Sequence, residues 1–268
     1  MVSREITHKT IPTQEGLDNK IVIENLNVSY SDGTESLRNV SLVIPNHAIT
    51  VLFGPAGGGK STLLRTINRL NDLADVVHLS GHIWLDGEDL LDPRIDVIAL
   101  RRRVGMVFAR PVVLPMTILQ NMTYGLELAG IRSRDYMEKT VERSLRAAAL
   151  WDEVRDRLKE PAVALSGGQQ QRLCLARVLA LEPEVILLDE PTSGLDPIST
   201  GKVEASLQEL KQLYTIILVP HSIQQAARTA DYAAFILNGQ LIEYTRGKKI
   251  FINPQEQRTE DYVEGRFG

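Results

Sequence analysis

The chain has 268 residues, 43% of them hydrophobic, so it could form one large domain with a sizeable core or two small ones. Its net charge of -4 and its pI near 5.8 do not indicate a general nucleic-acid-binding surface, and no nucleic-acid partner is expected. The single cysteine, Cys174, excludes an intrachain disulfide and fits a reducing compartment.

Membrane insertion is not expected of this chain. No apolar run reaches the roughly 18 to 20 residues that a membrane-spanning helix needs. The first residues, Met1 to Glu5, lack the apolar core of a secretory signal. We therefore expect a cytoplasmic chain, and any membrane span that it works with would belong to another polypeptide.

The N-terminal part of the sequence combines short strands with one helix. Residues 1–19 are polar and unpatterned, and we expect a loose arm there. A helix is predicted from Lys60 to about Leu70, after a glycine-rich loop. Short apolar runs rich in β-branched residues predict strands. These strands are expected at 21–23, 40–44, 49–53, 83–85 and 104–108.

Between residues 117 and 158, apolar residues recur at helical spacing and turn residues are scarce, which predicts a helical insertion. Beyond it, helices (167–181, 201–213, 222–230) should alternate with strands (185–188, 215–219, 233–237, 240–244). This alternation is typical of a mainly parallel sheet with helices on its faces. The expected organisation is an arm (1–19), a first core part (20–108), the helical insertion (109–160) and a second core part (161–268).

A phosphate-binding loop is predicted after the strand at 49–53. The pattern Gly-x-x-x-x-Gly-Lys-Ser lies between a strand and a helix, as this motif requires. Glycines let backbone N–H groups surround phosphate oxygens, and a helix N-terminus favours negative charge. Lys60 would contact the β- and γ-phosphates, and the Ser61 hydroxyl would ligate Mg²⁺. The predicted nucleotide-binding residues here are Gly54, Pro55, Ala56, Gly57, Gly58, Gly59, Lys60, Ser61 and Thr62; the alternative is a glycine-rich turn that binds nothing.

Two adjacent carboxylates, Asp189 and Glu190, follow the apolar strand at 185–188. Acids at a buried strand end are costly unless a cation or a water network uses them. We therefore predict that Asp189 belongs to the Mg²⁺ shell and that Glu190 orients or deprotonates an attacking water. The alternative is a solvated acidic turn before Pro191.

A third motif, Leu-Ser-Gly-Gly-Gln at 165–169, is expected to open a helix. Ser166 is a suitable N-cap, and Gly167 and Gly168 can present N–H groups to an anion. The segment therefore has the features of a second phosphate-binding helix end, far along the chain from the first. An ordinary capped helix is the alternative.

These three motifs in this order, followed by Ser193-Gly194-Leu195-Asp196 and by His221, resemble the nucleotide-binding subunit of an ATP-binding-cassette (ABC) transporter over nearly the whole chain. The resemblance implies an α/β fold of the RecA-like P-loop NTPase type. Its mainly parallel sheet core would carry an antiparallel β subdomain and an inserted α-helical subdomain. ATP and Mg²⁺ would be the cofactors, with Lys60, Glu190 and His221 as the catalytic residues.

The resemblance also implies a head-to-tail homodimer that forms on ATP binding. Its residues Ser166, Gly167, Gly168 and Gln169 would cap the ATP held by the partner's phosphate loop, and Asp196 would lie across the same interface. His221 would contact the γ-phosphate, although a lone histidine there could be structural. Tyr30 would stack on adenine; a core or edge-strand tyrosine is the alternative.

The partners implied by the resemblance are two transmembrane permease subunits and, indirectly, a periplasmic or extracellular substrate-binding protein. The chain would then lie at the cytoplasmic face of the inner membrane. The run 111–116 is apolar for a loop, which favours a partner-docking surface over the alternative of core packing. The arginines at 101–103 are interpreted as a solvated face rather than as a lipid or nucleic-acid patch.

Ala109 departs from the family pattern. The family usually carries glutamine here, which contacts Mg²⁺ and water and links the site to the transmembrane partner. An alanine side chain can neither ligate nor hydrogen-bond. Three interpretations stay open: slow hydrolysis, hydrolysis that needs the membrane partner, or a regulatory nucleotide binder.

Several segments resemble more narrowly the ATP-binding subunit of the bacterial high-affinity phosphate importer. They are 68–73, 85–90, 100–108, 148–154 and 258–268. None of these residues binds the transported ion, so phosphate is implied by the resemblance alone. The alternatives are import of another oxyanion or an amino acid, and a soluble ABC ATPase in DNA repair or translation.

Overall fold

The computed structural model describes residues 18–266. The loose arm expected at 1–19 lies outside the described residues except for its last two, and Asn19 already begins a strand. Among residues 18–266, no helix is long and apolar enough to cross a membrane.

One of the two sheets is antiparallel and has the strand order β2-β1-β4-β5. Its strands β1, β2 and β4 are much longer than the short runs predicted from the sequence, because bulges let the pairing continue past irregular points. One bulge surrounds Asn25, whose φ of 49° lies in the left-handed region. The strands are β1 (Asn19–Tyr30), β2 (Glu35–Pro45), β4 (Val76–Leu85) and β5 (Glu88–Asp89).

The second sheet has six strands in the order β10-β9-β3-β8-β7-β6. All neighbouring pairs are parallel except β10 with β9, so the prediction of a mainly parallel sheet beside an antiparallel one is confirmed. Every residue of β3, β7, β8 and β9 is buried, as expected for strands covered on both faces. The strands are β3 (Ile49–Phe53), β6 (Val104–Val107), β7 (Val185–Asp189), β8 (Thr215–Val219), β9 (Tyr232–Leu237) and β10 (Gln240–Arg246).

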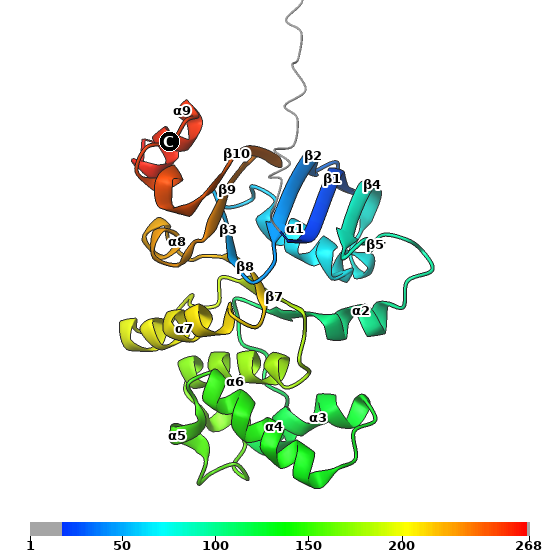
Figure 1. Cartoon of the computed structure of the whole chain (residues 1–268), viewed down its shortest axis with the longest axis vertical. Coiled ribbons are helices and arrows are strands. Elements are labelled where there is room, and N and C mark those ends of the chain that lie inside the picture. The colour runs from blue at the N-terminus through cyan, green and yellow to red at the C-terminus, as the bar shows by residue number, and fades with distance from the viewer. Residues whose placement is uncertain (1–17, 267–268) are drawn as a thin grey trace, which may run out of the picture.

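The helices divide between the sheets and a separate helical layer. Helices α3 to α6 lie together at the end of the molecule that is remote from the antiparallel sheet (Figure 1). The α-helices are α1 (Lys60–Ile67), α2 (Val97–Arg103), α3 (Ile118–Leu128), α4 (Arg134–Ala147), α5 (Trp151–Val154), α6 (Gly167–Leu179), α7 (Pro197–Leu210), α8 (Ile223–Thr229) and α9 (Gln257–Val263). Residues 18–266 also contain the short 3₁₀ helices η1 (Leu70–Leu73), η2 (Ala162–Ala164) and η3 (Gly247–Phe251).

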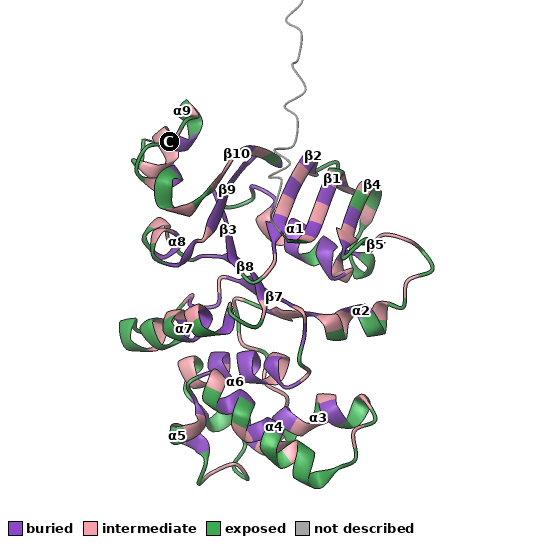
Figure 2. Ribbon diagram, viewed as in Figure 1, coloured by how far each residue is buried: buried purple, intermediate pink, exposed green. Residues whose placement is uncertain are grey.

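Two hydrophobic cores lie on opposite faces of the parallel sheet. Alternate residues of β3 point to opposite faces, so Val51 belongs to one core and Leu52 to the other. The first core extends into the helices α3, α4 and α6, and the second fills the space between the parallel sheet, α1 and the antiparallel sheet. The strands β3, β7, β8 and β9 between these layers are buried along their whole length (Figure 2).

Three predicted helix boundaries were wrong by three residues or more, and one of them is the end of α7, which lies at Leu210 and not at Leu213. The first helix ends at Ile67, not near Leu70, because Arg69 adopts a left-handed conformation with φ 61° that an α-helix cannot continue. Helix α7 begins at Pro197, four residues before the predicted start at 201. Asp196 caps it and Pro197 occupies the first helical position, where proline costs no hydrogen bond.

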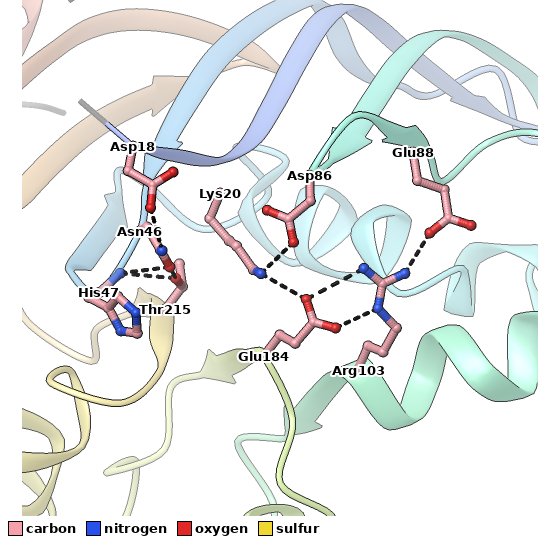
Figure 3. A network of polar contacts seen from close by, with 9 residues as sticks. All are labelled: Asp18, Lys20, Asn46, His47, Asp86, Glu88, Arg103, Glu184 and Thr215. Atoms are coloured by element: carbon pink, nitrogen blue, oxygen red, sulfur yellow. Dashed lines mark hydrogen bonds and ion pairs between the residues drawn. The ribbon is translucent and has the colours of Figure 1, made fainter. Parts of the chain in front are cut away.

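Glu184, just before β7, joins the antiparallel sheet to the parallel one (Figure 3). Its Oε2 accepts from Lys20 Nζ at 2.7 Å, and its Oε1 accepts from Arg103 Nε at 2.6 Å. Arg103 also pairs with Glu88 of β5. Of the arginines at 101–103, Arg102 is exposed, as the predicted solvated face requires, although it also donates to the carbonyl of Leu128 at 3.3 Å. Arg101 and Arg103 are half-buried, and Arg101 donates to the backbone carbonyl of residue 69.

These contacts make stability depend on pH. Hydrogen bonds from Arg103 and Lys20 lower the pKa of Glu184 from 4.5 to about 2. The stabilisation is therefore complete above about pH 4.5 and is lost as the pH falls through about 2. Because the side chain is 35% exposed, we expect Glu184→Gln to lower the free energy of unfolding at pH 7 by only about 1–2 kcal/mol, with the difference shrinking below pH 4.5.

Urea unfolding of both proteins at pH 7 and pH 3 measures this difference. The matched control is Glu138→Gln, which removes an exposed pair with Arg134 and should cost at most about 0.5 kcal/mol. Equal losses for the two variants would refute a special contribution of Glu184.

Candidate active site

The glycine-rich loop, Asp189, Glu190 and His221 converge because three parallel strands end at one edge of the sheet. β3 leads into the glycine-rich loop, β7 ends at Asp189, and β8 leads to His221. Asp189 pairs directly with Val219, so β7 and β8 end level with each other. In open α/β sheets, this carboxyl edge is where ligands bind.

The glycine-rich loop has a backbone that larger residues could not adopt. Gly54 has φ 140°, and a Cβ there would lie 2.0 Å from the carbonyl oxygen of Ile236. Gly59 has φ 101°, and its Cβ would lie 2.4 Å from the carbonyl oxygen of Ser36. Gly59 caps α1 with no side-chain hydrogen bond, so the N–H groups of the first turn keep their capacity to bind an anion.

Lys60 is the first residue of α1, and its side chain reaches back to the loop. Its Nζ donates to the carbonyl oxygens of Gly54 at 2.9 Å and Pro55 at 2.7 Å. Burial lowers the pKa of Lys60, while the nearby carboxylates of Glu190 and Asp189 oppose that shift. The loop therefore contains a partly buried cation with two acids close to it. Of the remaining loop residues, Ala56 and Gly57 are exposed and Gly58 is buried.

Two oxygen atoms that suit Mg²⁺ lie side by side next to this loop. The Ser61 hydroxyl donates to Asp189 Oδ1 at 3.0 Å. Hydroxyl and carboxylate oxygens are ligands that Mg²⁺ prefers, and it completes its shell with water and substrate phosphates. Within residues 18–266, no three His, Cys, Asp or Glu side chains could together hold a metal ion. The pair therefore fits a cation that arrives with a phosphorylated substrate better than a permanently bound one.

Glu190 and His221 face each other across the ends of β7 and β8. Glu190 Oε2 lies 4.0 Å from His221 Nδ1, and both side chains are well exposed. Glu190 has φ 47°, an uncommon conformation for a non-glycine residue. Its N–H donates to the carbonyl oxygen of Val219 at 2.9 Å, which holds this turn against β8.

Tyr30 lies beside the loop but is engaged by the protein itself. Its hydroxyl is 3.2 Å from Thr62 Oγ1 and 3.5 Å from Asn71 Oδ1. The ring is partly buried against the core between the two sheets. Thr62 also hydrogen-bonds Ser36 of β2 at 2.8 Å. Contact of the Tyr30 ring with a nucleotide base stays a prediction.

The 166–169 segment opens α6 with the predicted cap. Ser166 Oγ accepts from the Gln169 N–H, and Gln169 Oε1 accepts from the Ser166 N–H, which is a capping box. Gly167 is exposed, and Gly168 lies against α7, where a Cβ would be 2.9 Å from Ser199 Oγ. In the part of the chain that the structure describes, no hydrogen bond joins this segment to the 54–62 loop, and α6 lies in the helical layer (Figure 1).

Asp196, predicted at a subunit interface, is the N-cap of α7. Its carboxylate accepts from the N–H groups of Ile198 at 2.9 Å and Ser199 at 3.0 Å. The hydrogen bond with Ser199 is the main reason that the pKa of Asp196 is lowered. The carboxylate therefore has partners within its own chain, and contact across an interface stays a prediction.

Ala109 lies in a bend after β6 and is half-buried. The neighbouring carbonyl of Phe108 accepts from Gln171 Nε2 at 2.8 Å, which ties this bend to α6. Farther along the loop, the Val112 side chain is 59% exposed while its carbonyl accepts from Arg177 at 2.8 Å. The apolar run at 111–116 is thus anchored through its backbone and partly exposed through its side chains.

Glu153 of α5 makes contacts with the segment after Ser166 that the sequence reasoning missed. It pairs with Arg172 at 2.8 Å and with Lys202 of α7 at 2.5 Å, and it accepts from Gln169 at 3.1 Å. Hydrogen bonds from Arg172 above all lower the pKa of Glu153 to about 2. An acid in a short helix has no local pattern that marks such a role, because all three partners come from other helices.

A glycine loop after a parallel strand, a lysine at the following helix and an acid at the end of another strand of the same sheet define a P-loop nucleoside triphosphatase. The family model described as ABC transporter matches residues 37–193. The phosphate import ATP-binding protein PstB 1 of Yersinia pestis is 54% identical over 248 residues, 92% of each chain. The corresponding PstB 2 of Bacillus licheniformis is 52% identical over 257 residues, 96% of this chain and 93% of that protein.

Solved structures agree with this assignment. The cbiO1 protein of Clostridium perfringens, part of the ABC transporter complex cbiONQ, superposes with a TM-score of 0.77 at 30% identity, covering 93% of this chain and 97% of that one. A bacterial Atm1-family ABC exporter with ATP bound gives the same TM-score at 23% identity, covering 93% of this chain and 42% of that one, and shows the fold alone. The chain therefore belongs to the ABC transporter family, as an ATP-hydrolysing subunit.

The Glu153 contacts predict a marked loss of stability for Glu153→Ala. Arg172 is 3% exposed, so the substitution leaves a buried cation without its counter-ion. We expect the free energy of unfolding to fall by about 3 kcal/mol in urea titrations. The control is Asp152→Ala at a neighbouring site that is 82% exposed, where a change within about 0.5 kcal/mol is expected. Similar values for both variants would contradict this account.

Proposed function

We propose that this chain hydrolyses ATP to drive import of inorganic phosphate through a membrane ABC transporter. The observation that carries the proposal is the meeting of Lys60, the Ser61–Asp189 pair and the Glu190–His221 pair at one edge of the sheet. Phosphate as the imported substrate rests on the similarity to phosphate import ATP-binding proteins, since no described residue is assigned to the transported ion.

The triphosphate binds in the glycine-rich loop. N–H groups of the loop and of the first turn of α1 surround its oxygens, and Lys60 exchanges its two carbonyl partners for the β- and γ-phosphates. Ser61 and Asp189 would hold Mg²⁺, which would neutralise charge on the phosphates. Tyr30 packs against the base, which gives little selectivity between ATP and GTP.

Glu190 orients and deprotonates the water that attacks the γ-phosphate, and His221 contacts that phosphate. The two side chains lie close enough to act on the same group of atoms, and both are open to solvent and substrate. The side chain of Ala109 has no oxygen or amide group to offer to this site. Catalysis therefore relies on Glu190 and His221 without the contribution of the usual glutamine.

Two copies of the chain close head to tail around two ATP molecules. Ser166, Gly167, Gly168 and Gln169 of one copy cap the triphosphate held by the other, which explains why these residues lie apart from the phosphate loop of their own chain. Asp196 lies at the same interface. Hydrolysis removes the γ-phosphate and reopens the dimer.

The dimer docks on two permease subunits at the cytoplasmic face of the membrane, with a substrate-binding protein acting on the far side. The exposed apolar side chains of Phe108 and Val112, next to Ala109, support docking at this loop. A nonhydrolysing nucleotide-binding regulator is the second candidate function. Ala109 is the one observation that favours it.

Glu190→Gln is expected to abolish steady-state Mg-ATP hydrolysis while ATP still binds, because the amide cannot accept the proton of the attacking water. Light scattering should then show a dimer with Mg-ATP and a monomer without it.

Ala109→Gln, assayed beside the native chain, is expected to raise turnover. A native chain with no activity that Ala109→Gln restores would instead favour partner-dependent or regulatory function.

Deletion of the gene in its own host is expected to abolish high-affinity uptake of radiolabelled inorganic phosphate. The wild-type gene should restore uptake, and the Glu190→Gln gene should not, because transport needs hydrolysis. Uptake of sulfate and amino acids serves as the control. Normal phosphate uptake together with loss of one of these control substrates would redirect the assignment to that substrate.

A further inference from the structure

A buried glutamine of α8 connects the two loops that carry the catalytic side chains. Gln225 is 2% exposed. Its Oε1 accepts from the backbone N–H of His221 at 2.9 Å and from the hydroxyl of Thr192 at 3.1 Å. Thr192 is also buried and follows Glu190 by two residues. One oxygen atom therefore holds both the turn after β7 and the loop after β8.

The orientation of this amide is determined by its partners. Only an oxygen can accept from the His221 N–H, so Nε2 must point the other way. Nε2 is buried and has no hydrogen-bond partner among the described residues. A buried donor without a partner is destabilising. A hydrophobic side chain at position 225 would avoid the cost of the unpaired Nε2 group, yet the residue is a glutamine. The oxygen contacts are what the glutamine contributes.

The backbone of Gln225 is itself fixed. Its N–H donates to the side chain of Ser222, the N-cap of α8, at 3.2 Å, and its carbonyl accepts from Thr229 at 2.8 Å. The residue before His221 is Pro220, which has no N–H to hold the loop. The His221 N–H is therefore the first backbone donor after β8, and it is held by a rigid acceptor.

We propose that Gln225 is a positioning residue for ATP hydrolysis that sets the placement of His221 relative to Glu190. Its two contacts hold the Glu190 turn and the His221 loop in one arrangement, in which the side chains lie 4.0 Å apart. This inference rests on the proposed ATP hydrolysis. Gln225 touches neither substrate nor the reacting atoms, and acts through the two loops.

Gln225→Met tests the proposal, because methionine has a similar length and no comparable acceptor. We expect kcat to fall at least about tenfold while KM for ATP changes less than about twofold, since the phosphate loop is untouched and a small misplacement of catalytic groups is costly. Gln225→Glu, which keeps an oxygen for both donors, is expected to restore most of kcat. Gln224→Met is the matched control, because Gln224 is the exposed neighbour on the same helix.

Thermal unfolding and ATP affinity, measured for each variant, separate misplacement from misfolding. Should Gln225→Met not fold, Thr192→Val removes one of the two contacts and is expected to lower kcat in the same sense. A kcat for Gln225→Met within about twofold of the native value overturns the proposal. So does a loss of kcat that Gln225→Glu leaves unchanged.

Hydrogen exchange at the His221 amide distinguishes failure of this inference from failure of the proposed function. We expect the amide to be protected in the native chain and to exchange at least about tenfold faster in Gln225→Met. An inactive native chain with this pattern would refute ATP hydrolysis but leave the loop restraint intact. Equal exchange in both proteins would refute the restraint whatever the activity.

Discussion

The meeting of the carboxyl ends of β3, β8 and β7 at one edge of the sheet is the constraint on which the rest of this structure depends. These strands are buried on both faces, so their backbone groups must be satisfied by parallel pairing within the sheet, and the pairing brings their carboxyl ends to one edge. The glycine-rich loop, Asp189, Glu190 and His221 all follow these ends. The sheet thus holds the three distant segments that form the site in fixed positions relative to one another.

A cation and two carboxylates lie close together at this edge of the sheet. Lys60 is partly buried, which by itself favours its neutral form, while Asp189 and Glu190 favour the ammonium. Asp189 in turn accepts a hydrogen bond from Ser61. The groups that would receive a triphosphate and its metal ion therefore stabilise one another in the protein alone. Their attraction offsets part of the free-energy cost of removing ionisable groups from water.

Single buried or half-buried acceptors recur where elements must keep a fixed relation. Glu184 joins the antiparallel sheet to the parallel one, Glu153 joins α5 to α6 and α7, and Gln225 joins the loops after β7 and β8. Each accepts from at least two donors on different segments. Such contacts restrain direction as well as distance, which hydrophobic packing alone does not do.

The sequence by itself determined the class of fold and the motifs, because a P-loop, a capped helix and a buried strand are local patterns that need only their own neighbours. The cap at Ser166 and the strand from Ile49 to Phe53 were predicted correctly for that reason. Tertiary structure alone decided the bulged length of β1, the anchoring of Arg103 and the partners of Glu153 and Gln225. These depend on which distant segments the sheet and the cores bring together, and no spacing within one segment encodes that.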